Sequence, residues 1–266
     1  MNYGDRFWLA RLAYRQRDVR MAEAAHSHEH LENRLREYGA RGRHLADGVL
    51  GATDGIVTTF AAVAGAAGAN LSPGIVLIMG FANLLADGFS MAVGNYLGLQ
   101  SQQEAWKEER RREIWEIEHL PEAEREEIRR LYRGKGFKGE TLERIVETIT
   151  SDKQRWLEEM MREELGIQEQ GLAPLMSGLV TFTAFVAAGL LPLLPYIFAF
   201  LGLPFSWSLF SISLGVTAVA FFSVGAARCL VTRRSWWQSG AQILGVGGFA
   251  ALCAFAVGYV LRDLVE

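Results

Sequence analysis

Charged residues are confined to a few parts of this chain, and that segregation limits the folds open to it. Of the 27 basic and 30 acidic residues, 16 lie in residues 1–48 and 33 in residues 100–170. The other 147 residues therefore carry only eight charges. A soluble globular domain would spread charge over all of its surface elements. The pattern excludes a single soluble domain, and the net charge of −3 with 50% hydrophobic residues excludes a disordered chain or a strongly basic nucleic-acid binder.

Five apolar stretches occupy the poorly charged regions, and each is long enough to cross a bilayer, which takes about 20 mostly apolar residues as a helix. They run approximately over 50–70, 74–97, 175–194, 207–229 and 237–261. Each is rich in Gly and Ala, which membrane helices use to approach one another closely. A buried core helix could explain one such stretch but not five. The sequence therefore predicts an all-α, polytopic membrane protein with five transmembrane helices.

The distribution of Lys and Arg predicts which side of the membrane each connector occupies, because cytoplasmic connectors are enriched in basic residues. Nine Arg precede the first span, 14 Lys and Arg lie between spans two and three, and three Arg lie between spans four and five. The other two connectors have no charge. We expect a cytoplasmic N-terminal amphipathic segment (1–44), spans one and two (45–99), a cytoplasmic helical insert (100–170), and spans three to five (171–266). The C-terminus would lie outside, and the lack of an evident organelle sorting segment favours a bacterial plasma membrane.

The insert, residues 100–170, contains 19 acidic and 14 basic residues and predicts three helices that stand in water. The first continues span two without a breaker as far as about Glu118. The second begins at Pro121, a favoured residue in a first helical turn, and ends near Arg133. The third is expected over 141–165, closed by Gly166. For most of these charges, a solvated helix surface with ion pairs between successive turns is a sufficient explanation.

Several Glu and Met residues of the insert have spacings that would place their side chains on one helix face. Carboxylates alone would suit Ca²⁺ or Mg²⁺, and thioethers shift the preference toward softer metals such as Fe²⁺. The plain alternative is that Glu is common on helices and that Met commonly fills hydrophobic cores. The candidate metal ligands are Glu113, Glu116, Glu124, Glu127, Met160, Met161 and Glu164.

Two acidic residues lie inside the predicted spans, where an ionisable group costs about 2.5–3.5 kcal/mol on insertion scales and is a functional candidate by default. Asp54 is in span one. In span two, residues at four-residue intervals form a polar stripe on one helix face. Such a stripe could bind a divalent cation or exchange it for protons, or it could only supply hydrogen bonds between helices. The stripe consists of Asn83, Asp87, Met91 and Asn95.

Three segments resemble the vacuolar iron transporter family. They are Leu50-Gly-Ala-Thr-Asp54-Gly-Ile-Val-Thr-Thr in span one, Ser90-Met91-Ala-Val-Gly in span two, and Met160-Met161-Arg-Glu-Glu164 in the Glu-rich insert. The resemblance covers roughly residues 44–262 and includes the five-span layout.

This resemblance implies a homodimer that moves Fe²⁺, and often Mn²⁺, out of the cytosol in exchange for protons. It implies that the insert collects metal through the seven Glu and Met candidates, and that Asp54 and Met91 line the pathway between protomers. The chain departs from the family pattern at Gly94-Asn95-Tyr96, where many members have an acidic residue. Asp87, which many members lack, is the candidate to supply that charge and to carry the proton coupling.

The leading hypothesis from the sequence is a proton-coupled exporter of Fe²⁺, with Mn²⁺ as a further substrate, partnered by protons, membrane lipid and a second copy of the chain. A manganese-selective exporter and a membrane-anchored metal sensor or scaffold without transport are the alternatives. No enzyme is expected, because no paired nucleophile and base, phosphate loop or haem motif is present, and no resident cofactor or nucleic-acid partner is expected. His26, His28 and His30 could collect metal weakly, or they could be incidental residues of a surface helix.

Overall fold

The structure is a computed structural model that describes residues 16–20, 31–166, 173–228 and 235–264. Within these ranges, side chains are described for residues 16–20 and from residue 44 onward. Contacts divide the chain into two compact units, Met1–Gly42 and Arg43–Glu266. No strand occurs within these described ranges. The tail residues His26, His28 and His30 lie outside the described residues, so their expected role stays a prediction.

Five helical segments of the described chain are long and apolar enough to cross a membrane. They are His44–Gly68, Pro73–His119, Pro174–Phe200, Leu209–Ala227 and Trp236–Leu261. Each overlaps one of the five stretches expected from hydropathy. The chain is therefore an all-α polytopic membrane protein, as the segregation of charge predicted.

Helices α3 (Leu31–Gly68) and α4 (Pro73–His119) contain spans one and two and are joined by a short turn. Asn70 takes a left-handed conformation there (φ 56°), which Asn tolerates better than most residues. The N–H of Leu71 bonds back to the carbonyl of Ala66 (2.9 Å), so the last turn of α3 has its orphan carbonyl satisfied. Pro73 then begins α4, where its missing N–H costs nothing.

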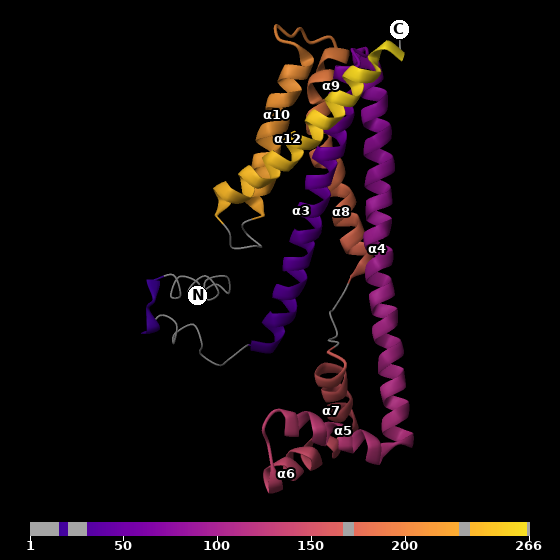
Figure 1. Cartoon of the computed structure of the whole chain (residues 1–266), viewed down its shortest axis with the longest axis vertical. Coiled ribbons are helices and arrows are strands. Elements are labelled where there is room, and N and C mark those ends of the chain that lie inside the picture. Colours follow the sequence, from indigo (N-terminus) through magenta and orange to yellow (C-terminus); the bar gives the residue numbers. More distant parts are fainter. Residues whose placement is uncertain (1–15, 21–30, 167–172, 229–234, 265–266) are drawn as a thin grey trace. The chain divides into compact units, whose positions relative to one another are not determined.

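Helix α4 runs without interruption from the membrane span into the insert, as the sequence predicted (Figure 1). Its 47 residues correspond to about 70 Å of helix, more than twice the roughly 30 Å hydrocarbon thickness. Only its first half is apolar, and the second half, from Gln100 onward, is highly charged. One rigid element therefore belongs to both the membrane part and the insert.

Span three is not a single regular helix. Helix α8 (Pro174–Gly189) passes through a 3₁₀ turn, η2 (Leu191–Leu193), into α9 (Leu194–Phe200). Pro192 and Pro195 account for the change of geometry, because proline cannot donate to the helical ladder. The buried hydroxyl of Ser213 donates to the carbonyl of Pro192 at 2.7 Å. Spans four and five are α10 (Leu209–Ala227) and α12 (Trp236–Leu261), followed by the 3₁₀ turn η3 (Arg262–Leu264).

Glycines allow α3 to pack directly on its neighbours. A Cβ added at Gly51 or Gly55 would lie 2.3 Å from the carbonyl oxygen of Thr181 or Phe185, both on α8. Farther along α3, the carbonyl oxygen of Gly65 lies 2.0 Å from where a Cβ would stand on Gly258 of α12. The core of the membrane part contains large buried side chains, including Phe60, Phe185 and Phe221.

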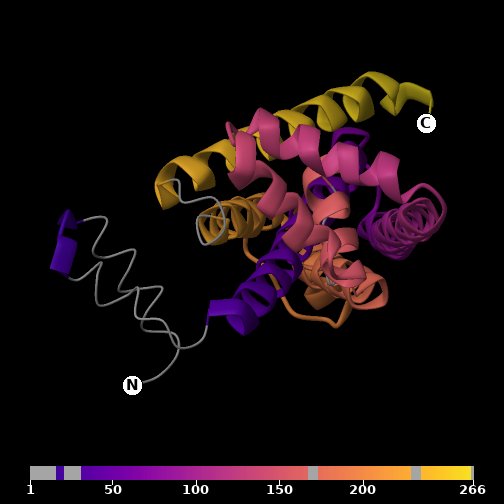
Figure 2. The same ribbon diagram turned by 90° about the horizontal axis from the view of Figure 1, so that it is seen from below.

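The insert consists of the second half of α4 together with α5 (Pro121–Gly134), α6 (Gly139–Thr150), α7 (Lys153–Glu159) and the π-helical turn η1 (Met160–Glu164). Figure 2 shows these segments from below. They enclose a separate apolar core, which consists of Ile117, Ile128, Leu142, Val146, Ile149, Trp156, Leu157, Met160 and Met161.

The expectation of one continuous third helix over 141–165 is wrong. The chain breaks at Ser151 and Asp152, where Asp152 has an extended backbone and its carboxylate accepts the N–H of Arg155 at 2.8 Å. Asp is a strong N-cap, so it begins a new helix in place of continuing the old one. The expected closing residue is confirmed, since Gly166 takes a left-handed conformation (φ 65°) directly after the last turn.

Candidate functional site

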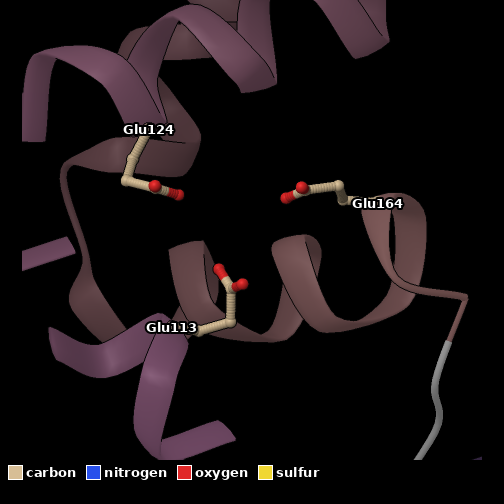
Figure 3. Close-up of side chains that lie close together, drawn as sticks. All are labelled: Glu113, Glu124 and Glu164. Atoms are coloured by element: carbon tan, nitrogen blue, oxygen red, sulfur yellow. The ribbon is translucent and has the colours of Figure 1, made fainter. Parts of the chain in front are cut away.

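Three carboxylates from three different segments of the insert meet at one place (Figure 3). Glu113 comes from α4, Glu124 from α5, and Glu164 from η1. One oxygen of each lies within 4.8 Å of one oxygen of each of the others. Glu113 is only 1% exposed and Glu124 only 5%, whereas Glu164 is exposed. We call these three carboxylates the acidic cup, in which Glu164 is the member accessible to water.

Helical periodicity and one irregular turn place these three side chains. Glu113 is four residues before the core residue Ile117, and Glu124 is four residues before Ile128, so both carboxylates share a face with an apolar anchor. Glu164 closes the π turn, in which the N–H of Leu165 bonds to the carbonyl of Met160 at 3.2 Å. This turn is one residue wider than an α-helical turn, and such turns often occur at functional sites.

Two of the buried oxygens have no hydrogen-bond partner within the described residues. They are Oε2 of Glu113 and Oε2 of Glu124. A buried carboxylate oxygen without a partner is costly, so such groups take up a proton or a cation. The two orphaned oxygens are an observation separate from the acidic clustering, and together the two features indicate a cation site.

The other two predicted glutamates lie beside this cup. Glu116 is half-buried on α4, and Glu127 is half-buried on α5. Both act electrostatically on Glu124, and Glu127 also shares a hydrogen bond with Glu164. All five predicted glutamates therefore interact.

Met160 and Met161 begin the π turn that ends at Glu164, and their role as metal ligands stays a prediction. Both are buried, at 0% and 5% exposure, in the apolar core of the insert. That packing is the core-filling role that Met commonly takes.

Burial and mutual repulsion raise the pKa values of two members of the site. Burial, with the charges of Glu127 and Glu113 next, raises the pKa of Glu124 to about 7. Burial, with the charges of Glu127 and Glu113 and a hydrogen bond to Glu127, raises the pKa of Glu164 to about 7. Near neutral pH both carboxyl groups therefore exchange protons readily, and each can exchange a proton for a metal ion.

Arg112 is the cation closest to the site among the described ion pairs. Its guanidinium lies 3.0 Å from Glu109, 3.3 Å from Glu113 and 3.5 Å from Glu116. The side chain of Arg112 is 49% exposed. The sequence analysis did not select Arg112, because it is one of three consecutive arginines with no distinguishing spacing.

In the membrane part, Asp54 and Asp87 lie near enough for their charges to interact. Both are half-buried. The amide nitrogen of Asn83, one turn from Asp87 on α4, is buried without a hydrogen-bond partner in the described part of the chain. Met91 is half-buried on the same stripe. The stripe on α4 and the aspartate of α3 thus form a second polar region.

Asn95 at the end of this stripe joins three helices. Its amide nitrogen donates to Oδ1 of Asp47 on α3 (3.1 Å) and to the hydroxyl of Thr181 on α8 (2.9 Å). The sequence analysis singled out neither Asp47 nor Thr181. Asp47 could have been found from its spacing, because it precedes Asp54 by seven residues and so shares its helix face. Asn95 makes hydrogen bonds between helices, as predicted by the alternative in which the stripe only joins helices.

Comparison with known proteins gives a consistent result over most of the chain. The sequence model of the VIT family matches residues 45–259. The chain is 34% identical to a protein of Toxoplasma gondii named vacuolar iron transporter, over 96% of this chain and 88% of that protein. It is 31% identical to the vacuolar iron transporter of Plasmodium falciparum, over 97% of both chains. It is also 30% identical to vacuolar iron transporter 1 of Arabidopsis thaliana, over 87% of this chain and 92% of that protein.

Proposed function

The chain belongs to the VIT family, and from that premise we propose that it exports a divalent metal ion, Fe²⁺ first and Mn²⁺ second, from the cytosol in exchange for protons. The observation that carries the proposal is the cup of Glu113, Glu124 and Glu164, with its two buried and unpartnered oxygens. Carboxylate oxygens bind divalent cations, and a site that stands in water can collect them from the cytosol. Relatives named as iron transporters support iron as the cargo.

Capture would be an exchange of cations at the insert. Glu124 and Glu164, whose pKa values are about 7, release their protons as the metal binds. Glu116 and Glu127 add negative charge beside the cup and can complete the coordination as ligands. Met160 and Met161 belong to the same π turn as Glu164, and their thioethers are the further candidate ligands.

Helix α4 links the insert to the membrane part. Glu113 and Asp87 lie 26 residues apart on this one helix, or about 39 Å along its axis. The second polar region, in the membrane part, would carry the metal from Asp47 and Asn95 past Met91 to Asp54 and Asp87. Asp54 and Asp87 would alternate between a metal-bound state and a protonated state, because two neighbouring carboxylates in a low-dielectric region favour partial neutralisation.

The proposal includes the expected assembly and orientation. The N-terminus and the insert face the cytoplasm, the C-terminus faces the other side, and two copies associate in the lipid bilayer. Many apolar side chains on the spans are exposed in the single chain, among them Ile78 (72%), Phe89 (66%) and Phe249 (71%), as expected of surfaces that meet lipid or a second copy. The three relatives named above are eukaryotic, so the bacterial plasma membrane has no support from them and stays a prediction.

Liposomes containing the purified protein and an iron-sensitive dye test this function. We expect Fe²⁺ uptake that responds to an imposed pH gradient and that is lost in Asp54→Asn. Asp263→Asn, which removes an exposed aspartate after the last span, is the matched control and should transport normally. Uptake that ignores both the pH gradient and Asp54→Asn would disprove proton-coupled transport. Metal binding with no flux would favour a sensor or scaffold.

One observation favours a second candidate, a manganese-selective exporter. The converging atoms of the site are carboxylate oxygens, while both methionines are buried in the apolar core. Oxygen ligands suit Mn²⁺ at least as well as Fe²⁺, whereas thioethers favour the softer metal. Uptake of each metal in competition with the other decides between the two candidates.

A further inference from the structure

Arg112 already partly neutralises the proposed metal site. Its guanidinium approaches two of the five glutamates of the site, Glu113 at 3.3 Å and Glu116 at 3.5 Å. Oε1 of the almost wholly buried Glu113 accepts a hydrogen bond from Nη2 of Arg112. A buried carboxylate needs a compensating charge. Arg112 provides that charge on one oxygen of Glu113, and the other oxygen, Oε2, has no hydrogen-bond partner among the described residues.

Arg112 also has a partner outside the three converging glutamates. Glu109, one turn earlier on α4, lies 3.0 Å from the same guanidinium. Because Arg112 is 49% exposed, its side chain can change rotamer at the surface without leaving a cavity in the core. Glu109 is not among the carboxylates that converge on the cup.

We propose that Arg112 is the built-in counter-cation of the metal-free insert and that it moves onto Glu109 when a divalent ion binds Glu113 and Glu116. This inference rests on the proposed function and adds a residue that sets its metal affinity. Guanidinium and metal compete for the same lone pairs, so the free energy of the Arg112 pairs is subtracted from that of metal binding. Arg remains charged at all working pH values, so it competes even where the carboxyl groups have no protons.

Two pairs of variants test the proposal in the full-length protein in detergent. Fe²⁺ binding is measured by anaerobic equilibrium dialysis at pH 8. Arg112→Gln should tighten binding about fivefold, the scale expected for losing half-exposed ion pairs. Arg111→Gln removes the same charge from the neighbouring residue, which pairs instead with Glu108 at 3.1 Å. It should leave the dissociation constant within about twofold, because well-exposed charges are strongly screened.

The second pair of variants removes the glutamate that pairs with each arginine, Glu109 for Arg112 and Glu108 for Arg111. Glu109→Gln should weaken Fe²⁺ binding about threefold, because Arg112 then has only the site carboxylates as partners. Glu108→Gln, which leaves only Arg111 without its partner, should change binding less than Glu109→Gln does. This pair keeps the proposal testable even if Arg112→Gln unfolds, which circular dichroism would reveal.

Different outcomes separate this inference from the proposed function. If Glu113→Gln binds Fe²⁺ as tightly as the wild type, the metal site itself is wrong and both proposals fail. If Glu113→Gln loses affinity but Arg112→Gln binds no more tightly than Arg111→Gln, only the role of Arg112 is overturned. Tighter binding by Arg112→Gln with weaker binding by Glu109→Gln is the expected result.

Discussion

At the scale of single residues, the site depends on carboxyl groups that are buried in a domain otherwise covered by charge. Glu124 is 5% exposed, and it faces Glu113, Glu116, Glu127 and Glu164. Burial and repulsion both favour its neutral form, and a metal ion reverses that preference by supplying positive charge. Proton and metal therefore compete for the same oxygen atoms.

This competition predicts how metal binding depends on pH. The pKa values of Glu124 and Glu164 are about 7, so below pH 7 the folded insert is increasingly protonated and metal must displace those protons. Fe²⁺ binding should weaken by about a hundredfold between pH 8 and pH 6, about tenfold for each competing proton, and the change should be shallower in Glu124→Gln, which has one competing proton fewer. Anaerobic equilibrium dialysis at pH 6, 7 and 8 measures it.

Glu122→Gln is the matched control, because Glu122 lies on the same helix with its side chain 84% exposed and pairs with Arg125. Its pH dependence should follow that of the wild type. A pH-independent dissociation constant in the wild type would contradict the assignment of exchangeable protons to Glu124 and Glu164.

At the scale of elements, the position of α3 is set by how closely its glycines approach α8. Gly51 and Gly55 stand on either side of Asp54 in the sequence, and both pack against backbone atoms of α8. The same helix α8 supplies Thr181, which accepts the hydrogen bond from Asn95. The contact between α3 and α8 therefore determines where the acidic residue of span one lies.

Gly55→Ala tests this contact. The new methyl group would lie 2.3 Å from the carbonyl oxygen of Phe185, so α3 and α8 must separate. We expect a loss of about 1–3 kcal/mol in stability and reduced transport. Gly94→Ala on α4 meets nothing within 4 Å and should be neutral or slightly stabilising, because Ala favours helix. Thermal unfolding in detergent compares the two variants, and equal melting temperatures would refute close packing at Gly55.

A polar network around the buried carboxylate of Glu159 holds the start of the π turn η1. Tyr132 on α5 donates from its hydroxyl to Oε1 of Glu159 at 2.6 Å, and Arg162 binds the other carboxylate oxygen at 2.5 Å. Glu159 is only 7% exposed and immediately precedes the turn that carries Glu164. The network connects α5 with the end of α7 and so orients one wall of the cup.

Tyr132→Phe should lower both the free energy of unfolding and the affinity for Fe²⁺. Removing the hydroxyl leaves a buried carboxylate oxygen without its donor, which costs about 1–3 kcal/mol. The looser η1 should also raise the dissociation constant for Fe²⁺ severalfold. Tyr259→Phe, at an exposed position on α12, is the control for removing a hydroxyl and should alter neither property. Normal Fe²⁺ binding by Tyr132→Phe would show that the network does not orient the site.

At the scale of the whole molecule, stability should depend on pH through the same carboxyl groups. Glu124 and Glu164 have pKa values of about 7 in the folded chain, against 4.5 for an ordinary glutamate. The folded state therefore binds protons more tightly than the unfolded state. The stabilisation from these protons is fully present below pH 4.5 and is lost as the pH rises through 7.

The metal-free protein should accordingly melt at a lower temperature at pH 8 than at pH 6. Adding Mn²⁺ at pH 8 should restore the melting temperature, because a ligand that binds only the folded state stabilises it. The double variant Glu124→Gln, Glu164→Gln should show a smaller pH effect and little response to Mn²⁺. Tryptophan fluorescence during heating measures all three, and a rise in melting temperature from pH 6 to pH 8 in the metal-free protein would contradict the linkage.

Local properties of the sequence were sufficient to predict most of the helices of this molecule. Apolar length predicted the five spans, the lack of a breaker after Leu97 predicted the continuous α4, and Pro121 and Gly166 marked where helices begin and end. Helical spacing selected the five glutamates as candidates, and position inside an apolar span selected Asp54 and Asp87. These features depend on residues close together in the chain, so their physical causes are visible in the sequence itself.

Tertiary structure decided which of these residues meet and in what state. It brings Glu113, Glu124 and Glu164 together from three segments, places Met160 and Met161 in the apolar core, and divides the expected third helix at Asp152. It also adds Arg112 and Thr181, which no spacing distinguishes, and Asp47, which shares a helix face with Asp54. Burial and electrostatic repulsion depend on neighbours that are distant in sequence, so pKa values, orphaned oxygens and counter-ions follow only from the folded chain.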